Sequence, residues 1–124
     1  MLLKHLKCLI LRMTLQDART LVIRDMVYDG EGPDAYFYAG VRGPRNAISE
    51  KTGVKVPYPT GDPTAILPEF KAASNGAEVT LDLPVDVVGV RWLSVWCNDF
   101  GVDFGSLKFP KKATLAAMLA EAKA

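Results

Sequence analysis

The sequence predicts an all-β fold, an antiparallel sandwich or flattened barrel with one short C-terminal helix. Three observations support this class. Short segments rich in Val, Ile, Leu, Tyr and Trp recur along the chain and are separated by turns that contain Gly, Pro, Asn or Asp. One segment, residues 78–83, alternates apolar and polar residues with the two-residue period of a half-buried strand. A good helical pattern occurs only at the end of the chain, from Thr114 onward.

Composition narrows the classes of protein that need to be considered. A chain of 124 residues is long enough for one hydrophobic core and too short for two. Its 49% hydrophobic and 23% charged residues are typical of a globular domain. The net charge of +1 gives no electrostatic reason to expect nucleic acid as a partner. Because no apolar run approaches the roughly 20 residues that cross a bilayer, we also expect no membrane span.

The first 18 residues predict a first strand or a helix packed on the core. Leucines are interleaved there with Lys4, His5 and Lys7, and the segment lacks the Trp or Phe anchors of an amphipathic helix on a membrane surface. The unbroken apolar stretch and the small-residue cleavage site of a secretory signal are also missing. We therefore expect this segment to pack on the protein.

Residues 19–28 and 35–39 predict two strands joined as a hairpin. Both segments are rich in β-branched, apolar or aromatic residues, and the connection, residues 29–34, contains two glycines and a proline. We expect Gly30 or Gly32 to adopt a positive φ, because this short connection must reverse the chain. The three consecutive aromatic residues of the second strand predict cover on both of its faces.

The later segments complete the sheets and add the helix. Residues 43–74 are rich in proline and weakly periodic, so within them we expect only a short edge strand at 54–56. Residues 102–109 predict a further strand. The helix is expected at 112–124, with Thr114 as its cap. Its apolar stripe consists of Leu115, Met118, Leu119 and Ala122.

The strand expected at residues 90–97 holds both tryptophans and one of the two cysteines. Strand alternation places Trp92, Ser94 and Trp96 on one face and Leu93, Val95 and Cys97 on the other. Because both faces are largely apolar, we expect a central strand covered on both sides. Cys97 ends this strand, where a thiol is well placed for chemistry. A small buried core residue has the same appearance, so both interpretations are open.

Several kinds of site are not expected. The cysteines, Cys8 and Cys97, form no CxxC pair and His5 is the only histidine, which argues against a zinc site. The separation of the two cysteines in sequence does not decide whether they form a disulfide. Phosphate-binding loops, dinucleotide-binding fingerprints and serine nucleophile elbows are missing, and the aspartates are scattered. We therefore do not expect a hydrolase.

Five blocks of sequence, in their order and spacing, resemble the DM-thirteen (DM13) domain. These blocks are TLVIRD at 20–25, YDGEGPDAYFYAG at 28–40, VTLDLP at 79–84, WLSVWC at 92–97 and FGVDFG at 100–105. The DM-thirteen domain occurs in Skeletor-type animal proteins beside DOMON domains, and also in single-domain proteins. The resemblance divides the chain into a divergent N-terminal segment at 1–18, a DM-thirteen-like β domain at 19–111 and the helix at 112–124.

The resemblance implies a domain that acts in electron transfer. The characteristic cysteine of the family matches Cys97, which would act as a bare redox thiol or as a ligand to a prosthetic group such as haem. Trp92 and Trp96, on the same strand, are then candidates for binding that group. A second axial ligand for a haem could come only from His5 or a methionine. The implied partners are DOMON-type or other redox domains.

The resemblance also implies an extracellular location, although no signal peptide is visible. One departure from the family pattern lies before residue 19, where Cys8-Leu9-Ile10-Leu11 replaces the usual glycine-containing first strand. Two other classes of function remain open beside electron transfer. One is an extracellular binding or adhesion module whose aromatic surface stacks on sugars or apolar groups, and the other is a purely structural β-sandwich. The aromatic surface would be formed by Trp92, Trp96, Tyr36 and Tyr38.

Overall fold

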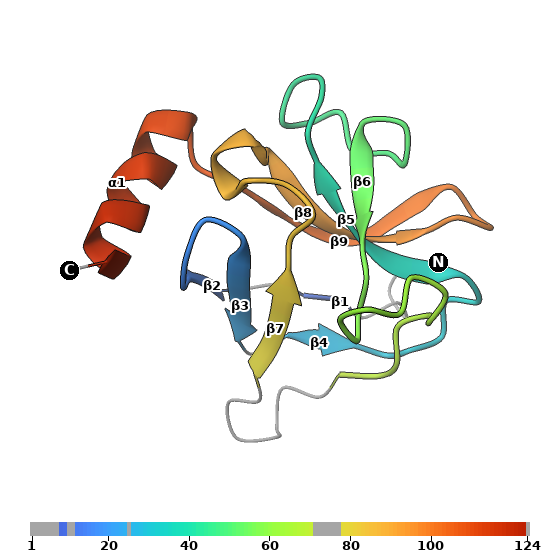
Figure 1. Ribbon diagram of the computed structural model, residues 1–124. Coiled ribbons are helices and arrows are strands. Elements are labelled where there is room, and N and C mark those ends of the chain that lie inside the picture. The colour runs from blue at the N-terminus through green and yellow to red at the C-terminus, as the bar shows by residue number, and fades with distance from the viewer. Residues whose placement is uncertain (1–7, 10–11, 25, 71–77, 124) are drawn as a thin grey trace.

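The computed structural model describes residues 8–9, 12–24, 26–70 and 78–123 (Figure 1). Its elements are β1 (Cys8–Leu9), β2 (Arg12–Leu15), β3 (Thr20–Arg24), β4 (Val27–Tyr28), β5 (Ala35–Gly40), β6 (Gly53–Val56), β7 (Glu78–Asp82), the 3-10 turn η2 (Val87–Gly89), β8 (Trp92–Cys97), β9 (Val102–Lys108) and α1 (Lys112–Lys123). The strands pair antiparallel in a four-stranded sheet of order β6-β5-β8-β9, a three-stranded sheet of order β2-β3-β7 and a small β1-β4 sheet.

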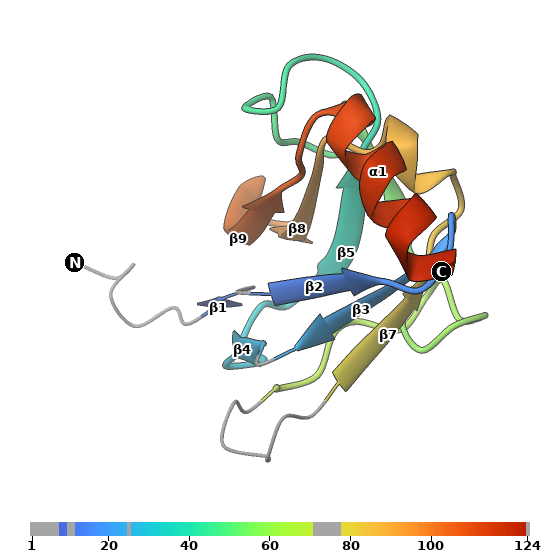
Figure 2. The ribbon, with the colours of Figure 1, turned by 90° about the vertical axis from the view of Figure 1, so that its left-hand side faces the viewer.

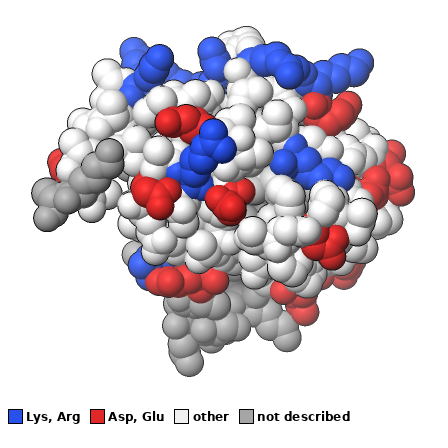
Figure 3. Space-filling view, in the orientation of Figure 1, with Lys and Arg blue, Asp and Glu red and all other residues white. Residues whose placement is uncertain are grey.

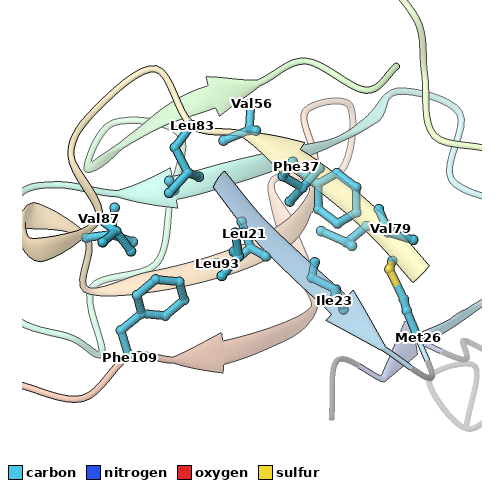
Figure 4. Close-up of a cluster of buried hydrophobic side chains, with 14 of the residues drawn as sticks. Leu21, Ile23, Met26, Phe37, Val56, Val79, Leu83, Val87, Leu93 and Phe109 are labelled. Carbon is cyan, nitrogen blue, oxygen red and sulfur yellow. The ribbon is translucent and has the colours of Figure 1, made fainter. Parts of the chain in front are cut away.

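The two larger sheets pack on each other as a sandwich, with their strands crossing (Figure 2). The core between them follows from strand alternation, because β7 buries Val79 and Leu81 and exposes the residues on either side. Leu21 from β3 and Phe37 from β5 have no exposed surface and meet in the same cluster (Figure 4). Full burial of such a side chain stabilises the fold by about 1.5–3 kcal/mol. The predicted sandwich is confirmed, and the described strands do not close into a barrel.

The strand β8 lies inside the four-stranded sheet, between β5 and β9, and all six of its residues are buried. Leu93 and Val95 face the core between the sheets, while Trp92 and Trp96 belong to a second apolar cluster on the outer face. The prediction of a central strand covered on both sides is therefore confirmed. The expected strands at 54–56 and 102–109 are confirmed as β6 and β9, and β6 is at the sheet edge.

The predicted hairpin between residues 19–28 and 35–39 is wrong. The first segment divides into β3, which pairs with β2 and β7, and β4, which pairs with β1. Met26 is buried in the core, and Tyr28 exchanges two backbone hydrogen bonds of 2.9 Å with Phe70. The chain thus passes from one sheet to another instead of folding back. Asp25, between β3 and β4 in the sequence, lies outside the described residues.

The connection that follows β4 confirms the prediction for one of its two glycines. Gly30 adopts φ 74°, and a Cβ atom there would lie 2.8 Å from the backbone nitrogen of Glu69. Gly32 donates its N–H to the Tyr28 hydroxyl at 2.9 Å. The positive φ thus serves a connection between two sheets, where the chain packs closely against residues near Phe70.

The helix α1 packs on η2 and β2 through Leu115, which has no exposed surface. Met118 and Leu119 are partly buried against the core, whereas Ala122, the fourth residue of the expected stripe, is exposed. The prediction that Thr114 caps the helix is wrong, because α1 already begins at Lys112. No helix within the described residues is long and apolar enough to cross a membrane.

Candidate functional site

The candidate site is built around Cys97 at the end of β8. Cys97 is a free cysteine without exposed surface, and its backbone neighbours in the sheet are Ala35 on β5 and Val102 on β9. By strand alternation its side chain shares the face of Leu93 and Val95. The thiol is therefore buried, with Ala35 and Val102 beside it on the two adjacent strands.

An exposed turn directly follows this buried thiol. The Gly101 N–H donates to the Cys97 carbonyl at 2.9 Å, and Gly101 adopts φ 62°. Residues 98–101 are all exposed, and the Phe100 side chain is 62% exposed. The Cys97 side chain is thus buried, whereas the next residue along the chain is exposed to solvent.

Asn98 fixes the other side of the turn. Its backbone N–H donates to the Asp34 carbonyl at 3.0 Å, and its side-chain amide donates to the Tyr38 hydroxyl at 3.2 Å. Tyr38 lies on the outer face of β5, so the amide connects the turn to the aromatic cluster of that face. The position of Cys97 is therefore set by hydrogen bonds from both ends of the turn.

The aromatic cluster covers the outer face of the four-stranded sheet. Trp92, Trp96 and Tyr38 are at most 8% exposed, and Tyr36 and Ile48 pack against them. The indole of Trp92 lies directly over Gly40, where any Cβ atom would overlap the ring. A glycine on β5 therefore provides the space in which the larger side chain of β8 lies flat.

Both indoles carry a buried N–H donor without a hydrogen-bond acceptor, Trp92 Nε1 and Trp96 Nε1. A buried donor that loses its hydrogen bond to water costs about 1–3 kcal/mol. The outer face therefore includes two groups that a bound acceptor or a buried water would satisfy. These are the buried side-chain donors without a partner within the described part of the chain.

Tyr36 and Lys55 lie at the margin of the cluster. The Asp34 carboxylate accepts a hydrogen bond from the Tyr36 hydroxyl and raises the pKa of Tyr36 to about 12, because the bond stabilises the protonated phenol. The Lys55 Nζ lies 3.6 Å from the centroid of the Tyr36 ring, in cation–π contact. Tyr36 is therefore a neutral donor at physiological pH and does not serve as a base.

Ser94 is the buried polar residue of β8, and its partner was not foreseen. Its hydroxyl donates to Asp103 Oδ1 at 2.7 Å, and the same oxygen accepts from the Gly105 N–H at 3.1 Å. The register between β8 and β9 shifts beside this pair, between Val95 and Trp96. Sequence reasoning had left Asp103 among scattered surface and turn residues. The usable signal was a serine within a strand that is apolar on both faces, because a buried hydroxyl needs a partner.

The three residues expected to form the site do not share one face. Trp92 and Trp96 lie in the outer cluster, whereas strand alternation places the Cys97 side chain on the opposite face of β8. Two hollows of the described residues, of about 870 and 580 Å³, are lined by other residues. The closed packing around Cys97 does not fit a haem, which needs an open slot beside its ligand. His5, the other expected ligand, lies outside the described residues, which also contain no cluster of three metal-binding side chains.

The aromatic surface expected of a binding module does exist as a cluster, but it is closed. Tyr36 is the half-buried member, whereas Trp92 has no exposed surface and Trp96 is only 6% exposed. A sugar ring needs an exposed aromatic face for stacking. The geometry therefore offers little surface for this class of ligand.

Comparison with known proteins shows what the chain resembles. The profile of a family described as "Electron transfer DM13" matches residues 11–109, most of the chain. The chain is 33% identical over 96 residues to Protein Skeletor, isoforms B/C, of Drosophila melanogaster, and equally to isoforms D/E. The matched region covers 76% of this chain but 11% and 6% of those two relatives. No solved structure matches it significantly.

Proposed function

This chain belongs to the Electron transfer DM13 family, and we propose that it transfers electrons through the thiol of Cys97. The observation that carries the proposal is the position of this thiol. Cys97 is a free cysteine held at the end of the central strand, immediately before an exposed turn in which Gly101 has a positive φ. A purely structural cysteine could lie anywhere in the core.

The chemistry proposed for Cys97 is exchange with a disulfide of a partner. When the turn opens, Cys97 loses its proton, and its thiolate attacks one sulfur of that disulfide. A new S–S bond forms to Cys97 while the partner's S–S bond breaks, and the departing sulfur takes up the proton. The Cys97 sulfur is thereby oxidised and the departing sulfur reduced. A thiol of a second, reducing partner then attacks the first partner's sulfur in this mixed disulfide, which releases the Cys97 thiol and completes the transfer of two electrons from the reducing thiol to the departing sulfur.

The partner proposed for this exchange is a second redox domain that carries a disulfide. The family resemblance points to DOMON-type domains as candidates. Because the chain spans about a tenth or less of the Skeletor proteins that it matches, further domains beside it are compatible with the proposal. The closed packing of Cys97 favours a thiol over a prosthetic-group ligand, so haem has no part in the proposed exchange. Binding of another group by Trp92 and Trp96 stays a prediction, supported by their two unpaired N–H donors.

The test is the rate at which Cys97 reacts, in the native state, with a small aromatic disulfide that releases a coloured thiolate. The Cys8→Ser protein leaves Cys97 as the only thiol. We expect one equivalent of thiolate, released at a rate nearly independent of urea well below the unfolding midpoint, because local opening exposes little surface. A thiol that reacts only as the whole domain unfolds would return Cys97 to the core and overturn the proposal.

Substitution of two glycines tests whether the thiol becomes accessible by opening of the turn after Cys97. The residues Gly101 and Gly61 both have a positive φ, 62° and 90°, and an added Cβ at either meets nothing within 4 Å. An L-residue in this conformation costs about 1–2 kcal/mol, so Gly101→Ala should accelerate the reaction of Cys97 about tenfold by weakening the turn. Gly61→Ala adds comparable strain in another loop and should leave the rate close to that of the parent. Equal acceleration by both variants would show that global stability governs access to the thiol.

A further inference from the structure

A hollow of about 870 Å³ lies at the end of the sandwich opposite to Cys97. The strand registers define these two ends, because Trp92 at the start of β8 pairs with Gly40 and Lys108, whereas Cys97 pairs with Ala35 and Val102. Three segments line the hollow: the loop after β5, the turn η2 with the residue before β8, and the turn from β9 into α1. It is separate from the site proposed for electron transfer.

The lining of this hollow is strongly basic. It includes five of the 15 lysines and arginines of the chain and no aspartate or glutamate. The five are Arg45, Arg91, Lys108, Lys111 and Lys112. Figure 3 shows blue side chains along the upper rim of the molecule, where Figure 1 places the loop after β5 and the start of α1. A net charge of only +1 thus conceals a local concentration of positive charge.

These charges are not neutralised within the described residues, where none of the five pairs with a carboxylate; the ion pair seen there joins Arg24 and Glu78. The Arg91 guanidinium donates to the Val41 carbonyl at 3.0 Å, which uses one of its five N–H donors. The first turn of α1 contains no acidic residue. Like charges gathered in this way repel one another, so an anion in the hollow would relieve a real electrostatic cost.

The main chain gives the hollow a defined shape. The Arg91 N–H donates to the Gly40 carbonyl at 2.8 Å, and the Arg91 carbonyl accepts from the Phe109 N–H at 2.9 Å. The ends of β5, β8 and β9 are therefore held together beneath the basic side chains. Val88 and Pro110, both partly exposed, add apolar surface to the lining. The site combines cationic side chains with a surface on which a ring can pack.

We propose that this hollow binds a compact organic polyanion that carries several sulfate or phosphate ester groups on a ring. Five cations spread over three segments call for several anionic groups, and the volume lies within the roughly 300–1,000 Å³ of small-ligand sites. The guanidinium groups of Arg45 and Arg91 suit the paired oxygens of these esters. A concave site of this size also fits a small ligand better than the flat surface of an acidic protein. Two sources share this chemistry, a sulfated oligosaccharide and an inositol polyphosphate.

Calorimetric titration of the intact chain at low ionic strength tests the proposal. The probes are inositol hexakisphosphate and a sulfated heparin-type tetrasaccharide, and the desulfated tetrasaccharide serves as the uncharged comparison. We expect saturable binding of at least one charged probe in a one-to-one ratio, and weaker binding as salt is added. The tighter of the two charged probes identifies the source of the ester groups, and either result supports the proposal.

Charge reversals place the binding in the hollow. Lys108→Glu and Lys111→Glu each change an exposed side chain of the lining and should raise the Kd about tenfold. Lys51→Glu changes an exposed lysine outside the lining by the same two units of charge and should change the Kd less than about twofold. An unchanged urea midpoint for each variant shows that its fold is intact.

Three results would overturn the proposal. The first is that neither charged probe gives saturable binding. The second is that Lys51→Glu weakens binding as much as the two lining variants, which would indicate attraction to net charge alone. Tighter binding of an oligoglutamate peptide than of both ester probes would make the hollow a docking site for an acidic polypeptide. None of these results bears on the disulfide exchange proposed for Cys97, because that reaction is measured at the other end of β8.

Discussion

The inner and outer faces of the central strand β8 are both buried, but different groups cover them. On the inner face, Leu93 and Val95 pack in the main hydrophobic core between the sheets. On the outer face, Trp92, Ser94 and Trp96 are covered by aromatic rings and by Ile48 from the loop after β5. The nitrogen and oxygen atoms of the β8 side chains from Trp92 to Trp96 therefore all lie on the outer face, where the Ser94 hydroxyl is paired and the two indole N–H groups are not.

This difference shows that a face can be fully buried while some of its polar groups have no hydrogen-bond partner. A sheet facing another sheet can exclude polar atoms, because strand alternation supplies only apolar side chains to that side. A face that is covered by a loop and by its own large rings retains indole and hydroxyl groups, whose hydrogen bonds depend on local partners. Asp103 supplies such a partner to Ser94, and no described residue supplies one to the indoles.

Truncation of a tryptophan on the outer face should have the largest effect on stability. Trp92→Ala removes a fully buried side chain above Gly40 and should lower the free energy of unfolding by about 3–5 kcal/mol, as in an inner core. Urea unfolding followed by far-UV circular dichroism measures the loss. Phe100→Ala is the control, because its side chain is 62% exposed and its removal should change stability by no more than about 0.5 kcal/mol. A Trp92→Ala protein with the parental midpoint would show that the outer cluster carries no core-like energy.

Removal of the Ser94–Asp103 hydrogen bond should have an intermediate effect on stability. Ser94→Ala leaves the Asp103 carboxylate with one donor fewer and should cost about 1–2 kcal/mol of unfolding free energy. A double-mutant cycle with Asp103→Ala isolates the pair, and the serine substitution should cost clearly less once the carboxylate is gone. Equal costs in both backgrounds would mean that the hydroxyl contributes through packing alone.

The smallest effect is expected from the titration of Tyr36. Its pKa is raised from 10.0 to about 12 in the folded protein, so the protonated phenol is favoured by folding. The resulting stabilisation is complete below pH 10 and is lost as the pH rises towards 12. Tyr36→Phe should therefore lose less stability than the parent over that interval, which urea midpoints at several alkaline pH values measure. Parallel pH profiles for the two proteins would refute the contribution of the Asp34 hydrogen bond.

Periodicity in the sequence was sufficient to predict the sandwich class, the alternation of residues 78–83 and the two-sided strand that ends at Cys97. Each of these depends on a pattern within one short segment, because side chains in a strand alternate whatever the strand pairs with. The positive φ of Gly30 belongs to the same group, although it serves a connection between sheets and not the expected hairpin.

Tertiary structure decided which strands pair and which side chains from distant segments meet. The strand-forming residues of 19–28 look the same whether they form one strand or two, and only the pairing of β3 with β7 and of β4 with β1 separates the two strands. Net charge is a sum over the chain and cannot show that Arg45, Arg91 and Lys108 line one hollow. The same holds for Ser94 and Asp103, nine residues apart and joined only by the register between β8 and β9. Local chemistry sets the elements of this protein, and long-range pairing brings its polar and charged groups together.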